Sequence, residues 1–157
     1  MTTTDTSRLR RALPADAESV RELTCAAYAA WIPIIGREPL PMRADYERAV
    51  REHWIELLYS GETLAALIEL VIEPDHLLVL NVAVEPAFQG QGHGNHLMRR
   101  AETIARELGQ NELRLFTNKQ FVRNIELYLR LGYSIDREEP FMNGFTVYMS
   151  KRLDRKP

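Results

Sequence analysis

Residues 84–95 read Val-Glu-Pro-Ala-Phe-Gln-Gly-Gln-Gly-His-Gly-Asn, and this stretch indicates a turn between a strand and a helix. An apolar run typical of a strand ends at Pro86, glycines alternate through residues 90–94, and a helical pattern follows from Asn95. Glycine lets backbone NH groups turn toward an anion, and a helix N-terminus adds unpaired NH donors with a partial positive charge. The stretch therefore predicts a phosphate-binding loop.

Two common nucleotide motifs do not match this loop. A Walker A loop ends in Gly-Lys-Ser/Thr, which is missing here. A dinucleotide-binding loop has the spacing G-x-G-x-x-G after the first strand and an acidic residue for the ribose, whereas this loop has G-x-G-x-G after a late strand. A nucleotide-binding protein is therefore only a third hypothesis, which preferential binding of ATP or NAD would favour.

The loop resembles the Gln/Arg-x-x-Gly-x-Gly/Ala motif of the GNAT family of acyltransferases, with Gln89, Gly92 and Gly94 in its three positions. Residues 117–133 are similar to the family's later motif, which has an Asn near a helix start, a Tyr four residues on and a closing Gly-Tyr. Residues 147–153 look like its usual last strand. The resemblance covers residues 8–153, and two motifs at the expected separation are more specific than one.

The hydrophobic pattern predicts strands and helices in the order β-α-α-β-β-α-β-α-β-β, an α/β (α+β) domain. The resemblance implies a GNAT-type, mixed, mostly antiparallel sheet flanked by helices. The second helix is expected to start at Asp45, to use Trp54 and Leu57 on its apolar face, and to end before Gly61. Asp16 and Asn124 are expected to cap helices. The expected strands are residues 8–13, 63–72, 77–84, 112–117, 133–137 and 145–151, and the best-defined helix is residues 95–108.

Composition limits the class of protein. A chain of 157 residues with 45% hydrophobic residues suits a single domain over residues 1–157, of which we expect 1–7 to be flexible. The net charge of −2 argues against a nucleic-acid partner, and no signal or membrane-spanning run is present, so we expect a cytoplasmic protein. Cys25 is the single cysteine, expected to be a small core residue. No His/Asp/Glu set has metal-ligand spacing, so we expect no metal.

The resemblance implies acetyl-CoA as co-substrate. Backbone groups of Val82 and Val84 would hold the pantetheine arm, and an NH there can polarise the thioester carbonyl. The backbone of residues 89–95 would hold the pyrophosphate, and Asn118 and Asn124 would contact the pantetheine or adjoining chain. Asn118 is equally suited to a turn and Asn124 to a helix cap. The cofactor candidates are Val82, Val84, Gln89, Gly90, Gln91, Gly92, His93, Gly94, Asn95, Asn118 and Asn124.

Tyr128 is the catalytic acid that the motif implies, since a phenol can protonate or stabilise the leaving thiolate. The attacking amine must lose a proton, and Glu69 is the candidate base because it interrupts an apolar strand, where it faces either solvent or a cleft. Asn81 stands where some relatives carry a carboxylate, and an amide cannot act as a base. His76 is a weaker candidate, whereas His53 and His96 are expected to be ordinary helix positions.

The acceptor site is expected under the first two helices, with Tyr28, Trp31 and Ile35 contacting the substrate. These residues suit plain packing equally well. The resulting hypothesis is an N-acetyltransferase that transfers acetyl from acetyl-CoA to a primary amine of a small molecule or peptide by direct attack in a ternary complex. The alternative is a non-catalytic acyl-CoA-binding or sensing module. We expect no membrane partner, and a homodimer is possible.

Overall fold

The computed structural model describes residues 7–153, so most of the segment expected to be flexible, residues 1–6, lies outside the described residues. Ser7 already belongs to the first strand. In these residues seven strands form one sheet in the order β1-β2-β3-β4-β5-β7-β6. The strands are β1 (Ser7–Arg11), β2 (Trp54–Ser60), β3 (Thr63–Ile72), β4 (Leu77–Val84), β5 (Glu112–Asn118), β6 (Ser134–Phe141) and β7 (Gly144–Arg152).

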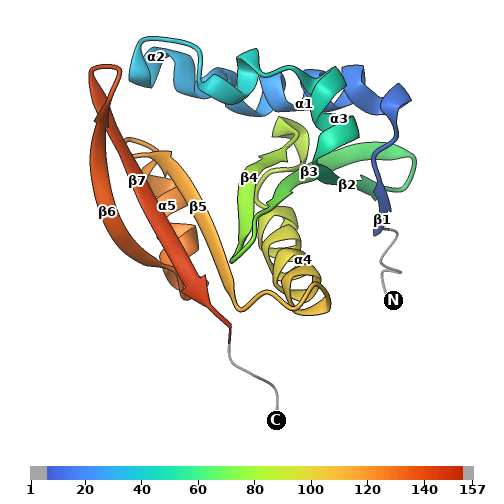
Figure 1. Cartoon of the computed structure of the whole chain (residues 1–157). Coiled ribbons are helices and arrows are strands. Elements are labelled where there is room, and N and C mark those ends of the chain that lie inside the picture. The colour runs from blue at the N-terminus through green and yellow to red at the C-terminus, as the bar shows by residue number, and fades with distance from the viewer. Residues whose placement is uncertain (1–6, 154–157) are drawn as a thin grey trace, which may run out of the picture.

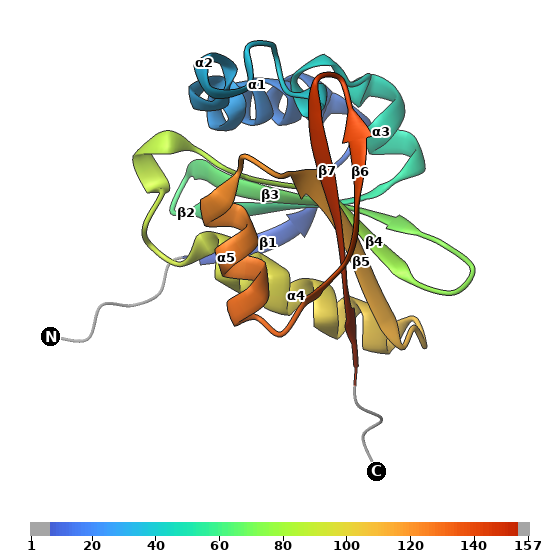
Figure 2. The same ribbon diagram turned by 90° about the vertical axis from the view of Figure 1, so that its left-hand side faces the viewer.

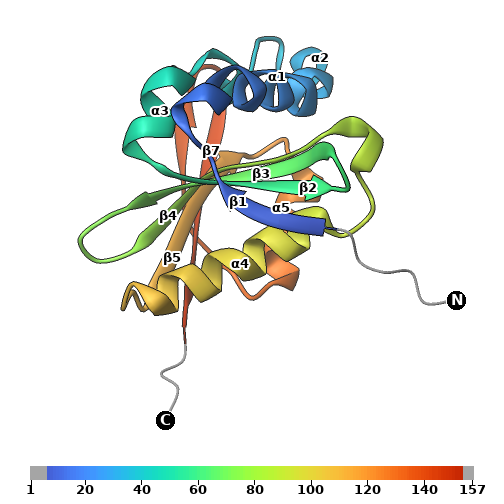
Figure 3. The ribbon, with the colours of Figure 1, turned by 90° about the vertical axis from the view of Figure 1, so that its right-hand side faces the viewer.

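Helices cover both faces of the sheet (Figures 1, 2 and 3). The α-helices are α1 (Ala17–Tyr28), α2 (Ile32–Ile35), α3 (Tyr46–Glu52), α4 (His93–Glu107) and α5 (Val122–Arg130). Short 3-10 turns are η1 (Pro14–Asp16), η2 (Ala29–Trp31), η3 (Leu40–Arg43) and η4 (Pro86–Phe88). The helices α1, α2 and α3 lie on one face and α4 and α5 on the other. No helix in the described part is both long and apolar enough to span a membrane.

Two apolar clusters lie on the two faces of the sheet. Residues of α1 and α3, among them Val20, Leu23 and Ala49, pack on one face. Residues of α4, among them Leu97 and Ile104, pack with β3, β4, β5 and β7 on the other. The expected fold class, a mixed and mostly antiparallel sheet flanked by helices, is confirmed, because only the β4–β5 pair is parallel.

The predicted element order lacked two elements, the one-turn helix α2 and the strand β2, whose residues were predicted to belong to the end of a helix. The helix α3 ends at Glu52, and residues 54–60 form a strand between β1 and β3. Residues 55–58 are all buried, since this strand is covered on both faces. A continuous buried run does not alternate, so its periodicity resembles that of a buried helix. Gly61, at φ 60°, belongs to the β2–β3 turn instead of ending a helix.

Asp16 is the N-cap residue of α1, as predicted, but its side chain does not cap the helix, because the carboxylate accepts hydrogen bonds from the Arg10 guanidinium at 2.8 Å and the Leu13 backbone NH at 2.7 Å. The predicted cap at Asn124 was wrong. Asn124 lies inside α5, whose N-cap residue is Phe121. In both places the polar residue was correctly near a helix start, but the chain used other groups to begin the helix.

The sheet divides where β4 and β5 separate. These strands pair only through Leu77, Val79 and their partners Leu113 and Leu115, with one pair between them. Directly after Val79, Leu80 is an extra residue in β4, since Leu70 pairs with Val79 and Glu69 with Asn81. Beyond this bulge the C-terminal half of β4 has no partner on its β5 side. The divergence leaves backbone groups and side chains of β4 available to line a site.

Candidate active site

The glycine-rich loop forms an anion site at the start of α4. Gly90 and Gly92 have φ values of 80° and 85°, in the left-handed region that glycine favours. Gly92 is the N-cap residue, no side chain caps the helix, and its first turn contains no acidic residue. The first helical bond runs from His96 NH to the Gly92 carbonyl, so the NH groups of residues 93–95 have no helical partner. This end of the helix can therefore bind a phosphate.

A groove of about 610 Å³, here called the loop groove, runs past this helix end. Gly90, Gly92, His93 and Asn95 line it, and Arg99, Arg123 and Arg130 add positive charge. The Nε2 atom of His93 is buried without a hydrogen-bond partner among the described residues, and its ring meets the Phe88 ring edge-on at 6.0 Å. The predicted residue Gln91 is exposed and does not line the groove.

A second hollow of about 540 Å³, the central cleft, lies between α1, the end of β4 and α5. Its walls include Tyr28, Trp31, Val82, Val84, Asn124 and Tyr128. The loop groove and the central cleft share Val84, Gln89, Gly94 and Asn124, so they lie side by side, and the two together are called the channel. Of the predicted residues, Asn118 lies outside this channel, and its Oδ1 accepts a bond from the Gln120 backbone NH at 2.9 Å.

The backbone of β4 presents polar groups to the central cleft. The Glu85 NH donates to the Ala65 carbonyl, so in this antiparallel register Asn81 and Ala83 also face β3. The NH and C=O groups of Val82 and Val84 consequently point the other way, where β5 has separated. The Gln89 side chain donates to the Val84 carbonyl at 3.2 Å, which ties the loop to the strand end.

Tyr128 lines the central cleft from α5 and packs against the core beneath α4. Burial raises the pKa of Tyr128 to about 12, so the phenol is protonated near neutral pH. Its ring lies 6.1 Å from that of Tyr133, and its hydroxyl has no hydrogen-bond partner among residues 7–153. A protonated hydroxyl that faces a cleft without a partner is available to donate to a ligand.

Asn81 connects the sheet to α1 through both ends of its side-chain amide. Its Oδ1 accepts a bond from the Tyr28 hydroxyl at 3.0 Å, and its Nδ2 donates to Thr24 Oγ1 at 3.2 Å. Burial raises the pKa of Tyr28, and the charges of Tyr128 and Glu69 raise it further. Tyr28 therefore interacts electrostatically with two groups of the site, Tyr128 in the central cleft and Glu69 beyond Asn81.

Glu69 is buried, with 3% of its surface exposed, so the solvent-facing alternative for this residue was wrong. Its Oε2 lies 2.6 Å from Nδ1 of His53, whose side chain is 26% exposed. Burial raises the pKa of Glu69, and the hydrogen bond and charge of His53 offset part of that rise. Both residues line a cleft of about 410 Å³, the α3 cleft, with Leu80, Asn81 and Phe116.

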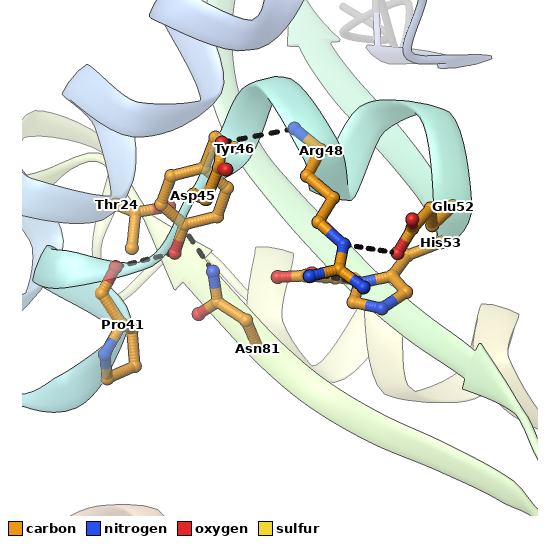
Figure 4. A network of polar contacts seen from close by, with 9 residues as sticks. Thr24, Pro41, Asp45, Tyr46, Arg48, Glu52, His53 and Asn81 are labelled. Atoms are coloured by element: carbon orange, nitrogen blue, oxygen red, sulfur yellow. Dashed lines mark hydrogen bonds and ion pairs between the residues drawn. The ribbon is translucent and has the colours of Figure 1, made fainter.

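His53 is the residue that the sequence pattern did not identify, because the pattern predicts a helix there. It is the residue after α3, in an extended conformation, where the chain turns into β2 (Figure 4). Recognising a hairpin between β2 and β3, with its turn at Gly61, would have identified His53 as a candidate. In that hairpin Ile55 pairs with Glu69, so His53, two residues before Ile55, lies at the same end of the sheet. The signal depended on recognising β2 as a strand.

A smaller cleft of about 100 Å³, the hairpin cleft, lies between the α2 region and the β6–β7 hairpin. It contains Ile35 and Phe141, shares Tyr28 with the central cleft, and shares Leu80 and Phe116 with the α3 cleft. Of the predicted acceptor residues, Tyr28 and Trp31 line the central cleft and Ile35 lines the hairpin cleft. The three clefts therefore meet around Tyr28 and the β4 bulge.

A model of the Acetyltransferase (GNAT) family matches residues 17–133, which is more than half of the chain. The chain belongs to this family. A curated relative, the uncharacterized N-acetyltransferase YvbK of Bacillus subtilis, is 24% identical over 102 residues. That match covers 61% of this chain and 66% of YvbK, so it spans slightly less than two thirds of the relative's length.

Solved structures of the family share the fold. PaiA N-acetyltransferase from Thermoplasma acidophilum, in complex with coenzyme A, has a TM-score of 0.79 and 19% identity, covering 93% of this chain and 98% of that one. A GNAT family acetyltransferase from Elizabethkingia anophelis with acetyl-CoA bound has a TM-score of 0.67 and 15% identity, covering 96% and 100%. At these identities the likeness shows the fold, and the activity has to be argued from the site.

Proposed function

We propose that this protein transfers an acetyl group from acetyl-CoA to a primary amine of a small molecule or peptide, by direct attack in a ternary complex. The observation that carries the proposal is the channel made by the adjoining loop groove and central cleft. One end offers helix NH groups and arginines, which suit phosphates. The other end is mostly apolar and ends at Tyr128, which suits a thiol-bearing arm.

The chain's own residues fit acetyl-CoA in charge and shape. A Cβ built on Gly90 or Gly92 meets no atom within 4 Å, so the loop surface is open to an approaching pyrophosphate. A Cβ built on Gly94 would meet only Leu127 Cδ2, at 3.9 Å, which is an ordinary van der Waals contact. The backbone groups of Val82 and Val84 suit the amides of a pantetheine arm, which would extend the β4 edge.

The reaction requires a bond to form from the amine nitrogen to the thioester carbon and the carbon–sulfur bond to break. The Tyr128 hydroxyl suits the departing sulfur. With a pKa of about 12, against roughly 8.5 for an ordinary thiol, full proton transfer to the thiolate would be uphill by about 5 kcal/mol. We therefore infer that Tyr128 acts chiefly by donating a hydrogen bond to the sulfur as its negative charge develops.

The amine also has to lose a proton. Asn81 has no basic group and is bonded to Tyr28 and Thr24, so we infer that the buried carboxylate of Glu69, which pairs with Asn81 across the sheet, takes part in removing the proton. We propose that the acceptor enters through the hairpin and α3 clefts, with Tyr28, Trp31 and Ile35 contacting it. This direction brings the amine to the β4 bulge, between Glu69 and the channel that suits the thioester.

Calorimetric titration with acetyl-CoA, with ATP and NAD as controls, tests the proposal first. Micromolar binding of acetyl-CoA alone supports the channel, and an amine panel with free-thiol detection then tests transfer. Binding without thiol release from any amine favours the alternative of an acyl-CoA-binding or sensing module. The absence of binding to acetyl-CoA and longer acyl-CoAs would refute both functions.

A further inference from the structure

We propose that His53 is the catalytic base, with Nε2 taking the proton from the attacking amine and Glu69 holding the imidazole from behind. This inference rests on the proposed acetyl transfer. It changes the role of Glu69 from the direct base to a positioning residue. The arrangement follows the logic of a carboxylate–imidazole pair, in which a buried carboxylate fixes the tautomer of a histidine and stabilises its charged form.

The contact geometry assigns the two ring nitrogens different roles. Nδ1 of His53 is 2.6 Å from Glu69 Oε2, whereas Nε2 has no partner among the described residues. Glu69 is almost wholly enclosed, while the His53 side chain is 26% exposed and lines the α3 cleft. A substrate amine in this cleft can reach the imidazole much more easily than it can reach the carboxylate behind it.

Counting protons shows that the pair can accept one. With Glu69 ionised, His53 carries its proton on Nδ1 and donates it to the carboxylate, so Nε2 has a free lone pair. The amine proton then adds at Nε2, and the pair changes from a net charge of −1 to zero. Burial disfavours the ionised carboxylate, so gaining a positive neighbour relieves part of that cost. No oxidant or metal is needed for this step.

The other charged or titratable side chains near the pair either have partners of their own or stay neutral near neutral pH. Arg48 and Glu52 form an ion pair at 2.8 Å, and Asp45 accepts a bond from the Arg48 backbone NH at the start of α3 (Figure 4). Burial raises the pKa of both Tyr28 and Tyr46, so neither ionises near neutral pH. The charged or titratable groups that line the α3 cleft with the pair are Asp45, the N-cap residue of α3, and Tyr46, Arg48 and Glu52 of α3. Tyr28 of α1 donates to Asn81, which also lines this cleft.

The position of the pair also connects it to the reaction. Glu69 pairs with Asn81 across the sheet, directly beside the Leu80 bulge, and Val82 is the next residue on β4. Leu80 and Phe116 line both the α3 cleft and the hairpin cleft, which reaches Tyr28. An amine at the bulge therefore lies between the pair and the central cleft, and its proton reaches Nε2 directly or through one water.

The test compares two acceptors in wild type and in His53→Gln, whose amide cannot take a proton. A simple alkylamine is mostly protonated near neutral pH, whereas hydroxylamine is mostly neutral. We expect His53→Gln to lower kcat/KM for the alkylamine by about 100-fold or more and that for hydroxylamine by less than about tenfold. His96→Gln, which changes an exposed histidine of α4 that lines none of the clefts described, is the matched control and should leave both unchanged.

Equal losses with both acceptors, or activity within about threefold of wild type with the alkylamine, would overturn the role of His53. The ¹⁵N NMR signals of His53 supply a readout that does not need turnover. We expect the neutral ring to carry its proton on Nδ1 and to lose that preference in Glu69→Gln. A ring protonated on Nε2 throughout the neutral range would refute the inference even if acetyl transfer is real. If wild type neither binds acetyl-CoA nor releases thiol, the proposed function fails instead.

Discussion

A negative charge introduced at Gly92 should weaken cofactor binding while the protein still folds. Gly92 and Gly109 stand at the two ends of α4, are both exposed, and have φ values of 85° and 75°. A Cβ at either one meets no atom within 4 Å. Gly92→Glu and Gly109→Glu therefore introduce the same side chain with the same backbone strain and without steric overlap. They differ in that Gly92 alone lines the loop groove.

Gly109→Glu should be the less stable of the two variants, although Gly92→Glu should be the one that binds acetyl-CoA more weakly. Left-handed backbone costs a non-glycine residue about 1–2 kcal/mol in both. The helix dipole favours the carboxylate at Gly92 and disfavours it at Gly109, by about 0.3–1 kcal/mol each. Gly109→Glu should consequently be the less stable protein, with Tm lower than wild type by roughly 3–10 °C, and Gly92→Glu should lose less.

Binding of acetyl-CoA should follow the reverse order. A carboxylate about 5 Å from a phosphate charge repels it by about 1–3 kcal/mol at an effective dielectric between water and a protein surface. Two such charges weaken binding about 30-fold at the least. Calorimetry should therefore show this loss for Gly92→Glu and wild-type affinity for Gly109→Glu. Equal affinities in the two folded variants would contradict the placement of the pyrophosphate on this loop.

Three further changes test other parts of the site. Tyr128→Phe should lower kcat about 100-fold with little change in Tm, because the lost hydroxyl has no partner in the described residues; steady-state kinetics and thermal melting check this. Arg100→Ala removes the cation from the buried Glu56 carboxylate, leaves it only the Trp54 indole NH, and should cost about 2 kcal/mol. The control Arg99→Ala, which changes an exposed neighbour, should not change Tm. Glu69 has a raised pKa in the folded protein, so the stability that its protonated form contributes is lost as pH rises through that pKa. The Tm of Glu69→Gln should therefore rise relative to that of wild type as the pH increases. Glu56 has the opposite sign, since hydrogen bonds from its partners outweigh burial and lower its pKa, so Glu56→Gln should lose its disadvantage in acid; a flat difference for either variant contradicts the assignment.

Much of the fold followed from local sequence. The helix α4, the β3–β4 hairpin and the strand β5 were predicted within about two residues, since each has a clear period and a clear end. The strand β2 was not, because being central in the sheet removes the alternation that identifies a strand. The missing strand also hid the register that brings His53 beside Glu69. One error in a local pattern thus concealed a tertiary contact.

The candidate site, like the fold, could be predicted only where its features depend on residues that are close together in the sequence. The glycine loop could be predicted because three glycines and a helix start are adjacent in sequence, and the structure gives Gly90 and Gly92 the expected left-handed backbone. The surroundings of Glu69 could not, because burial and partners depend on segments far apart in the chain. Asn118 illustrates the limit, since the turn that it stabilises was one of its two expected roles, and it lies outside the channel.

Asn81 cannot act as a base, and its contacts give a physical reason why the base lies at another position in the site. A carboxylate there could accept from the hydroxyls of Tyr28 and Thr24, but its negative charge would be buried beside Glu69, its partner across the sheet. The neutral amide of Asn81 therefore makes the buried connection between β4 and α1 without a second buried negative charge. The neighbouring strand supplies the negative charge instead, at Glu69, where His53 can pair with it. The same pairing exposes the imidazole to the cleft, so a stable connection at Asn81 and a base at His53 are compatible parts of one arrangement.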